Sequence, residues 1–217
     1  MTPRLLEVRQ KVLNKNDLAA RSLRDRFQAA GVCVISLVSS PGSGKTAFLE
    51  RILTILGNQF RVAALVGDLA TDNDAKRLAR SQAPVKQIIT GTVCHLDASM
   101  VNAAIDEWSL SDLDFLFIEN VGNLVCPSSY DLGENARAVL LSVTEGEDKP
   151  LKYPSIFQTA DAAVITKVDL AEAVEFDRAE AYRNINAIRP GLPIFESSAK
   201  SEDGLEDVLN WFTSQRR

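Results

Sequence analysis

Short apolar runs rich in β-branched residues alternate with longer amphipathic stretches from Val32 to the end of this chain. Such apolar runs are typical of strands that are buried on both faces, and the amphipathic stretches between them are typical of helices. A helix between two strands lets those strands run parallel in one sheet. The pattern therefore predicts an α/β fold with a mostly parallel sheet, helices on both of its faces, and ligand sites at the carboxyl ends of its strands.

The same patterns place the individual elements. We expect strands at residues 32–38, 62–66, 115–119, 139–143, 162–166 and 193–196, with a weaker one at 87–90. We expect helices at residues 45–56, 74–81, 97–107, 173–188 and 205–215. Ahead of them, apolar residues recur at roughly helical spacing among charges. The chain is thus expected to comprise an N-terminal helical arm, residues 1–30, and one larger domain, residues 31–217.

Composition argues against several classes of protein. Of the 217 residues, 46% are hydrophobic and 24% are charged, which is ordinary for a globular domain. The net charge of -5 provides no overall positive field, and no apolar stretch reaches membrane-spanning length, so neither nucleic acid nor a membrane is an expected partner. Three cysteines cannot all pair within one chain, and no apolar leader opens the sequence, which favours a cytoplasmic location.

One glycine-rich segment has the sequence of a phosphate-binding loop. Ser-Ser-Pro-Gly-Ser-Gly-Lys-Thr at residues 39–46 follows the first predicted strand and opens a helix, as such a loop requires. The glycines let backbone N–H groups turn toward phosphate oxygens, Lys45 can reach the β- and γ-phosphates, and Thr46 offers a hydroxyl to Mg²⁺. Ser39 stands where a first glycine is usual. The segment predicts a P-loop NTPase, with nucleotide-binding residues Pro41, Gly42, Ser43, Gly44, Lys45, Thr46 and Ala47.

Two later segments favour guanine over adenine. Thr166-Lys167-Val168-Asp169 ends a predicted strand and resembles the Asn-Lys-x-Asp signature that reads guanine, with Thr where Asn is commoner. The Asp169 carboxylate could accept from guanine N1–H and the exocyclic amine, while the Lys167 stem covers the ring. Ser198-Ala199-Lys200 resembles the segment whose backbone meets guanine O6. Each is weak alone, because Lys and Asp after a strand often form a solvated turn. Their order after a phosphate loop indicates GTP.

Acidic residues at other strand ends are candidates for the magnesium shell. Glu119 ends a very apolar strand, where burial would be costly without a partner such as a magnesium-bound water. Gly122 completes a Glu-x-x-Gly version of a switch segment and could place a backbone N–H near the γ-phosphate. Asp68 and Asp74 are further candidates, although Asp72 or Asp74 could instead cap a helix. The expected catalytic residues are Lys45, Thr46, Glu119 and Gly122.

The single histidine, His95, lies beside Cys94, and Cys126 follows the switch segment. Thiolate and imidazole are ligands for nickel or zinc. Two or three ligands leave the coordination shell of a metal ion incomplete, and a twofold dimer could complete it because each chain would supply the same ligands. From the residues alone, a lone histidine and two buried thiols are the simpler interpretation. Cys33, inside the first strand, is expected to be a core thiol. A nucleophilic thiol is disfavoured because adjacent residues rarely align for proton transfer.

Taken together, these segments resemble one family, the hydrogenase maturation GTPases called HypB nickel-incorporation proteins, in the signal-recognition-particle-like branch of GTPases. The combination covers nearly the whole domain and is far more specific than the phosphate loop alone. The matching segments are residues 39–46, 67–75, 90–98, 119–127, 145–154 and 166–169.

The resemblance implies a GTPase that dimerises with GTP and delivers nickel to [NiFe]-hydrogenase large-subunit precursors, together with a partner nickel metallochaperone. It also implies that Cys94, His95 and Cys126 bind nickel or zinc at the interface of a homodimer. Because Cys126 lies soon after Glu119 and Gly122, a γ-phosphate-dependent shift of this segment would move a metal ligand. Nucleotide state and metal affinity would then be coupled.

Three features set limits to this resemblance. Residues 1–30 contain neither Cys nor His, so the N-terminal metal binding and nickel storage of some members are not expected. Lys149, more than Lys152, resembles a residue that reaches the nucleotide across the dimer, although both could be solvated loop charges. No Gln or Arg stands out as a water-positioning residue or arginine finger, which predicts slow intrinsic hydrolysis.

Three other functions compete with this interpretation. A urease accessory GTPase also handles nickel, but it typically has a Cys-Pro-His arrangement where this chain has Cys94-His95-Leu96, and a Glu-Ser-Gly-Gly-Asp switch where this chain has Glu-Asn-Val-Gly. A small-molecule kinase would leave Asp169 and the Cys-His loop unexplained. A non-enzymatic metal carrier would use its nucleotide site only for structure.

Overall fold

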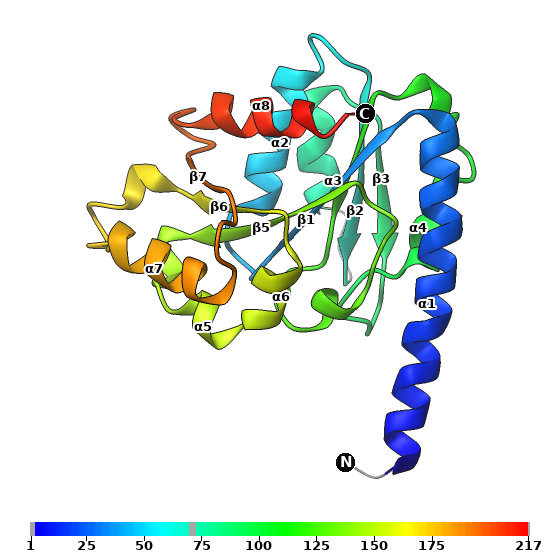
Figure 1. The fold of residues 1–217 in the computed structure, drawn as a ribbon. Coiled ribbons are helices and arrows are strands. Elements are labelled where there is room, and N and C mark those ends of the chain that lie inside the picture. The colour runs from blue at the N-terminus through cyan, green and yellow to red at the C-terminus, as the bar shows by residue number, and fades with distance from the viewer. Residues whose placement is uncertain (1–2, 70–72, 217) are drawn as a thin grey trace.

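The computed structural model describes residues 3–69 and 73–216, with side chains from Gln10 onward. Its strands form one sheet in the order β3-β2-β4-β1-β5-β6-β7, with every neighbouring pair parallel (Figure 1). The predicted α/β P-loop fold is confirmed, with β1 at the centre. The strands are β1 (Cys33–Ser39), β2 (Val62–Asp68), β3 (Val85–Ile89), β4 (Phe115–Glu119), β5 (Ala136–Ser142), β6 (Ala162–Thr166) and β7 (Ile194–Ser197).

Helices cover both faces of this sheet, and short 3₁₀ turns connect several elements (Figure 1). The helices are α1 (Pro3–Ala30), α2 (Lys45–Leu56), α3 (Asn73–Leu78), α4 (Ala98–Ile105), α5 (Lys149–Lys152), α6 (Pro154–Thr159), α7 (Arg178–Ile188) and α8 (Leu205–Ser214). The 3₁₀ turns are Ala79–Ser81, Leu110–Asp112, Cys126–Ser129, Val143–Glu145 and Val168–Leu170.

The alternation of side chains along β1 explains why two layers of helices form. Ile35 and Leu37 are fully buried in a cluster with apolar residues of α2 and α8. Val34 points to the opposite face and is buried in a cluster with α1 and α4. A third cluster joins α6 and α7 to β5 and β6. A central strand that is apolar on both faces therefore needs helices on both sides of the sheet.

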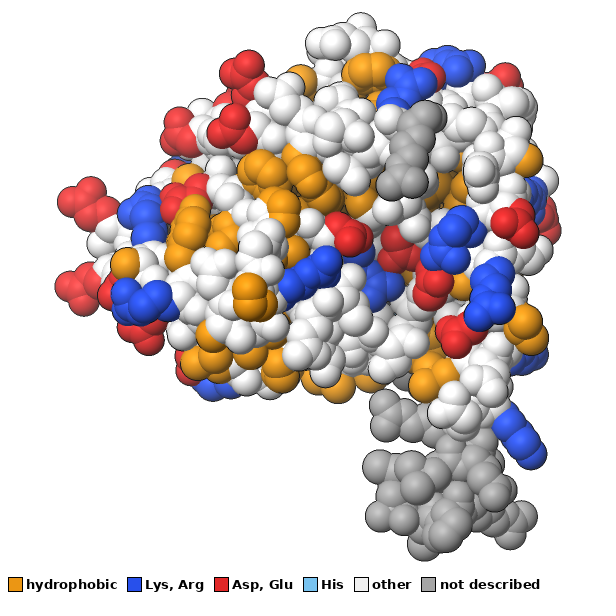
Figure 2. Space-filling view, viewed as in Figure 1, with side chains coloured by type: hydrophobic (Ala, Val, Ile, Leu, Met, Phe, Trp, Pro, Cys, Tyr) orange, Lys and Arg blue, Asp and Glu red, His pale blue; other side chains and the backbone are white. Residues whose placement is uncertain are grey.

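Helix α1 lies along the domain through its C-terminal half, while its N-terminal half extends away from it (Figure 1). Ala20, Leu23 and Phe27 are at most 1% exposed and belong to the same apolar cluster as α4. Over the outer surface of this region, acidic and basic side chains intermix (Figure 2). None of the helices in the described parts of the chain is long and apolar enough to span a membrane.

Several predicted boundaries differ from the structure, and two of them have an identifiable reason. Strand β5 begins at Ala136 rather than at residue 139, because Arg137 is buried in the strand with its charge paired to Glu134 at 2.8 Å. Helix α7 begins at Arg178 rather than at residue 173, because the Asp177 side chain accepts from Glu180 N and caps the helix there. The short helices α5 and α6 were not predicted.

Candidate functional site

The phosphate loop connects β1 to α2 in the middle of the carboxyl edge of the sheet. Gly42 and Gly44 have φ angles of 77° and 89°, a conformation that glycine adopts without steric cost. Ser39 is fully buried in the place of the usual first glycine, and its Oγ accepts from Ser43 Oγ–H at 2.7 Å. The loop is therefore held in shape by its own side chains, with the N-terminus of α2 directly behind it.

Glu119 ends β4 beside this loop, since β4 pairs with β1 and Glu119 lies opposite Leu37. Its side chain is 1% exposed, and its Oε1 accepts from Lys45 Nζ at 2.9 Å and from Thr46 Oγ1 at 2.7 Å. These two donors compensate the cost of burying the carboxylate. Glu119 Oε2 is also buried and has no hydrogen-bond partner within the described part of the chain. Glu119 can therefore accept one more donor at the phosphate loop.

The switch segment that follows Glu119 packs directly on the phosphate loop. A Cβ atom on Gly122 would lie only 3.1 Å from Pro41 Cα, so glycine permits this close approach. The next residue after Glu119, Asn120, is 1% exposed, and its backbone N–H donates to Leu37 O at 3.0 Å. Its side-chain oxygen accepts from Leu96 N at 3.0 Å. Asn120 thus connects the phosphate-loop strand with the loop that carries Cys94 and His95.

The predicted base-reading segment contacts the phosphate loop through two side chains. Thr166 Oγ1 donates to Ser43 O at 2.7 Å, and Lys167 Nζ donates to Gly42 O at 2.7 Å. Ser198 Oγ donates to Asp169 Oδ1 at 2.6 Å, which joins the segment to the one after β7. All of the base-reading residues predicted from the sequence line a common cleft.

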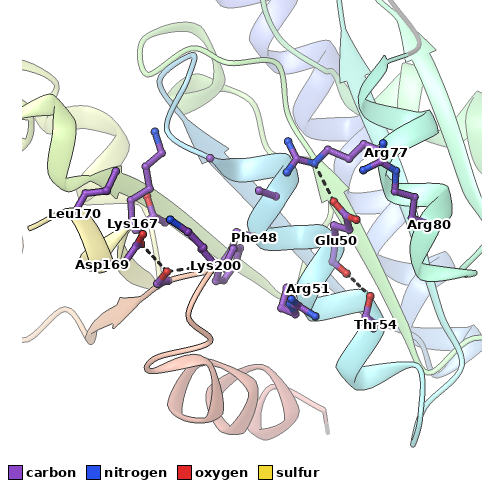
Figure 3. A pocket seen from close by; sticks show the side chains of 15 residues that line it. Phe48, Glu50, Arg51, Thr54, Arg77, Arg80, Lys167, Asp169, Leu170 and Lys200 are labelled. Atoms are coloured by element: carbon purple, nitrogen blue, oxygen red, sulfur yellow. Dashed lines mark hydrogen bonds and ion pairs between the residues drawn. The ribbon is translucent and has the colours of Figure 1, made fainter.

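This cleft has a volume of about 510 Å³ and runs across α2 (Figure 3). Lys167, Asp169 and Lys200 line one end, and Arg77 and Arg80 line the other. Several of the lining side chains could not be predicted from the sequence, because nothing local distinguishes them from ordinary helix surface. The missed residues are Phe48, Glu50, Arg51, Thr54, Arg77, Arg80 and Leu170.

The remaining predicted nucleotide and magnesium residues lie around this edge. Asp68 ends β2, which neighbours β4, and its Oδ1 accepts from Leu69 N at 2.6 Å. Asp74 is half-buried in the first turn of α3. Asp72, the alternative helix cap, lies outside the described residues.

Both candidate trans lysines lie in α5. Lys149 Nζ lies 3.9 Å from Glu145 Oε1 and 5.5 Å from the centre of the Tyr153 ring. Lys152 is more exposed and pairs with Asp148. Within one chain, therefore, each lysine has an acidic neighbour. Lys149 is the more restrained of the two because it also packs against an aromatic ring.

Cys94, His95 and Cys126 come together at the same edge of the sheet. Their candidate ligand atoms all lie within 4.8 Å of one another, and the two Sγ atoms are 2.8 Å apart. The His95 ring stacks on Tyr130, with 3.8 Å between ring centroids and an interplanar angle of 30°. Asn123, in the switch segment, donates to Cys94 O at 3.2 Å. The roles of Asn120, Asn123 and Tyr130 could not be predicted from the sequence, since their contacts depend on the fold.

One of the three candidate ligands, His95, is in its metal-binding form at neutral pH, whereas Cys126 holds its proton. Burial lowers the pKa of His95 below its ordinary value of 6.5, with Asp97 opposing the shift, so the imidazole is neutral. Its buried Nδ1 has no hydrogen-bond partner within the described residues. The hydrogen bond shared by the two thiols and burial raise the pKa of Cys126, so an ion must displace a thiol proton when it binds. Cys33 is 4% exposed, and burial raises its pKa to about 11.

A phosphate loop at the carboxyl edge of a parallel sheet makes this chain a P-loop NTPase. Residues 33–196 match the family model described as CobW/HypB/UreG, nucleotide-binding domain. The chain belongs to the CobW/HypB/UreG family and, within it, to the hydrogenase maturation factors called HypB.

Individual relatives agree with this assignment. The chain is 46% identical over 215 residues to the hydrogenase maturation factor HypB of Azotobacter vinelandii, which covers 98% of this chain and 70% of that one. It is 43% identical over 216 residues to the hydrogenase/urease maturation factor HypB of Helicobacter pylori, covering 98% and 88% of the two chains. The crystal structure of HypB from Helicobacter pylori in complex with nickel has a TM-score of 0.88 at 44% identity, over 94% of this chain and 95% of that one.

Proposed function

We propose that this protein is a GTP-hydrolysing nickel metallochaperone that dimerises with GTP and supplies nickel during [NiFe]-hydrogenase maturation. One observation carries the proposal. Cys126 lies in the same short segment as Glu119 and Gly122, and its thiol lies within 4.8 Å of the ligand atoms of Cys94 and His95. A single stretch of chain therefore contacts both the phosphate loop and a candidate metal site.

The phosphate loop and the cleft would hold GTP by complementary contacts. Lys45 and the N–H groups of the loop would bind the phosphates, while Asp169 would accept from the guanine N–H groups. Thr46 and, through a water, Glu119 would hold Mg²⁺, which would neutralise phosphate charge; the unpartnered buried Oε2 of Glu119 could accept that water's hydrogen bond. Lys45 would move from Glu119 to the nucleotide. Hydrolysis would be slow, because none of these side chains is a Gln or Arg that aligns the attacking water.

The Cys94–His95–Cys126 cluster would bind nickel or zinc. Two thiols and a neutral imidazole match the ligands that both ions accept. Three ligands leave a coordination position open, and a second copy of the chain would supply the remainder at a twofold interface. Lys149, rather than Lys152, would reach the partner's nucleotide. A partner metallochaperone and the hydrogenase large-subunit precursor would then be the source and the recipient of nickel.

The proposal is tested by sedimentation and metal analysis with GDP, a non-hydrolysable GTP analogue and no nucleotide. We expect dimers with the GTP analogue, and one tightly bound nickel or zinc ion per two chains. Cys94→Ala and Cys126→Ala should each lose the ion and still bind GTP. Cys33→Ala is the matched control, since its thiol lies in the core of the sheet, and it should keep the ion. Unchanged metal binding in both ligand variants would contradict the proposal.

A slow steady-state rate of GTP hydrolysis is also expected for the wild-type protein. Turnover many times per second without a partner would contradict the proposed absence of a water-positioning side chain. Metal-dependent dimerisation with no detectable hydrolysis would instead indicate a plain metal carrier with a structural nucleotide site.

A further inference from the structure

Asn16 is a buried polar residue on the inner side of α1. Asn16 is only 7% exposed, and the residues of α1 that pack near it on the domain are largely apolar. Its Oδ1 accepts from Ala98 N at 2.9 Å, and its Nδ2 donates to Asp131 O at 2.9 Å. One amide thus uses both its acceptor and its donor on two segments that are distant in sequence from it and from each other.

These two segments are the ones that carry the candidate metal ligands. Ala98 follows three residues after His95 and begins α4. Asp131 follows directly after Tyr130, whose ring stacks on His95, and lies five residues after Cys126. The Asn16 amide therefore bridges the loop of Cys94 and His95 to the segment of Cys126, from the side of the domain that α1 covers.

Holding α1 on the domain does not require this amide. Leu23 and Phe27 pack into the apolar cluster beneath the helix. Arg24 Nη2 contacts both carboxylate oxygens of Asp131 at 2.7 and 2.8 Å, and Arg26 contacts Asp106 at 2.7 Å. A buried amide at position 16 instead imposes a fixed spacing on its two backbone partners, because it must satisfy both.

We propose that Asn16 is a positioning residue for the Cys94–His95–Cys126 site, fixing the separation of its two ligand segments and making α1 a structural part of the metal centre. The proposal rests on the metal-binding function proposed above. Outer residues that orient metal ligands typically change metal affinity by about 10- to 100-fold when they are replaced. Any movement of α1 relative to the domain would change the geometry of the site.

The test uses two substitutions of Asn16 in the full chain. Asn16→Ala removes both hydrogen bonds. Asn16→Asp keeps an acceptor for Ala98 N at the start of α4 but loses the donor to Asp131 O, so it preserves the bond to α4 and breaks the bridge. Arg26→Ala is the matched control, because it removes an α1–α4 contact and touches neither segment's backbone.

The first readout is Ni²⁺ affinity, measured by competition with a chelator and by the thiolate-to-nickel absorption band. Both Asn16 variants should bind Ni²⁺ at least about tenfold more weakly than the wild type, with an altered absorption band. Arg26→Ala should bind Ni²⁺ like the wild type, and all three variants should keep the nucleotide affinity of the wild type. If Asn16→Asp binds Ni²⁺ like the wild type, Asn16 only satisfies the first N–H of α4 and the proposal is wrong.

The second readout needs no metal. An aromatic disulfide reagent forms a mixed disulfide with one thiol and releases one thiolate, and attack by the neighbouring thiol then closes a Cys94–Cys126 disulfide and releases a second thiolate. The ring-closing step should be several-fold slower in both Asn16 variants than in Arg26→Ala. Equal rates would overturn the proposal. If the wild type binds no nickel at these residues, the proposed function fails, and this rate comparison still decides the role of Asn16.

Discussion

The nucleotide site and the candidate metal centre share one edge of the sheet but are built in different ways. The phosphate loop is a contiguous segment between β1 and α2, and Glu119 ends the strand beside it. The candidate metal centre takes its candidate ligands from two loops, and side-chain amides of Asn16, Asn120 and Asn123 join those loops to their surroundings.

This difference distinguishes a site built within one contiguous segment from a site assembled across loops. Backbone geometry and strand pairing determine the position of Lys45 relative to Glu119. A small number of hydrogen bonds determines the spacing between Cys94 and Cys126. Substitutions near the nucleotide should therefore act locally, whereas substitutions well away from the thiols should change metal binding.

The largest effect is expected from Lys45→Met. Loss of a buried charged hydrogen-bonding group costs about 2–5 kcal/mol, so affinity for a fluorescent GTP analogue should fall at least about thirtyfold. Nickel affinity without nucleotide should stay the same, because no metal-site residue contacts Lys45 in the described structure. The exposed Lys152→Met is the control. A parallel loss of nickel binding in nucleotide-free Lys45→Met would contradict the expected local effect of this substitution.

Asn120→Ala should break the connection between the sites. It leaves the buried Leu96 N–H and Val121 N–H without their acceptor, so the free energy of unfolding in urea should fall by about 1–3 kcal/mol. The difference in nickel affinity between the GDP and GTP-analogue states should shrink.

Asn184→Ala is the matched control for Asn120→Ala. It removes an amide hydrogen bond to Glu147 O on another part of the molecule. This variant should keep the full nucleotide-dependent difference in nickel affinity. An undiminished difference in Asn120→Ala would exclude Asn120 from the coupling.

Thr166→Val should have a smaller effect, limited to the nucleotide. It removes the hydrogen bond to Ser43 O, which is worth about 0.5–1.5 kcal/mol, so GTP affinity should fall by about two- to tenfold. Thr166→Ser, which retains the hydroxyl, should bind GTP like the wild type. The same loss in both variants would show that the methyl group matters rather than the hydrogen bond.

The smallest effect concerns the pH dependence of the metal-free protein. Because burial lowers the pKa of His95, the unfolded chain binds this proton more readily than the folded chain. This group's stabilising contribution is present above pH 6.5 and is lost as the pH falls below that value. Urea unfolding of His95→Gln should show a smaller loss of stability between pH 7.5 and 5 than the wild type. Identical pH profiles would contradict the neutral buried imidazole.

Sequence patterns were sufficient for most of the fold because the signals were local. Phe115–Glu119 and Ala162–Thr166 were predicted with the observed bounds, since each is a fully buried apolar strand. The start of β5 was misplaced because Arg137 looks like a surface residue until its partner Glu134 is known. Local hydrophobicity cannot reveal a charge that a neighbouring side chain neutralises.

The candidate site divides in the same way. Gly42, Gly44 and Lys45 could be predicted because phosphate binding needs a fixed local spacing. The hydrogen bonds of Asn16 to Ala98 and Asp131 could not be predicted, since they join residues 82 and 115 positions apart. The grouping of Cys94 and His95 with Cys126 was implied only by family resemblance, and the structure brings the three together.

Coupling between nucleotide and metal is the central claim, and nickel affinity in defined nucleotide states tests it most directly. Nickel should be titrated against the wild-type protein saturated with GDP and, separately, with a non-hydrolysable GTP analogue. Couplings between sites typically amount to about 1–3 kcal/mol, so the two nickel affinities should differ by at least about fivefold. Equal affinities in the two states would show that the shared segment from Glu119 to Cys126 does not connect the sites.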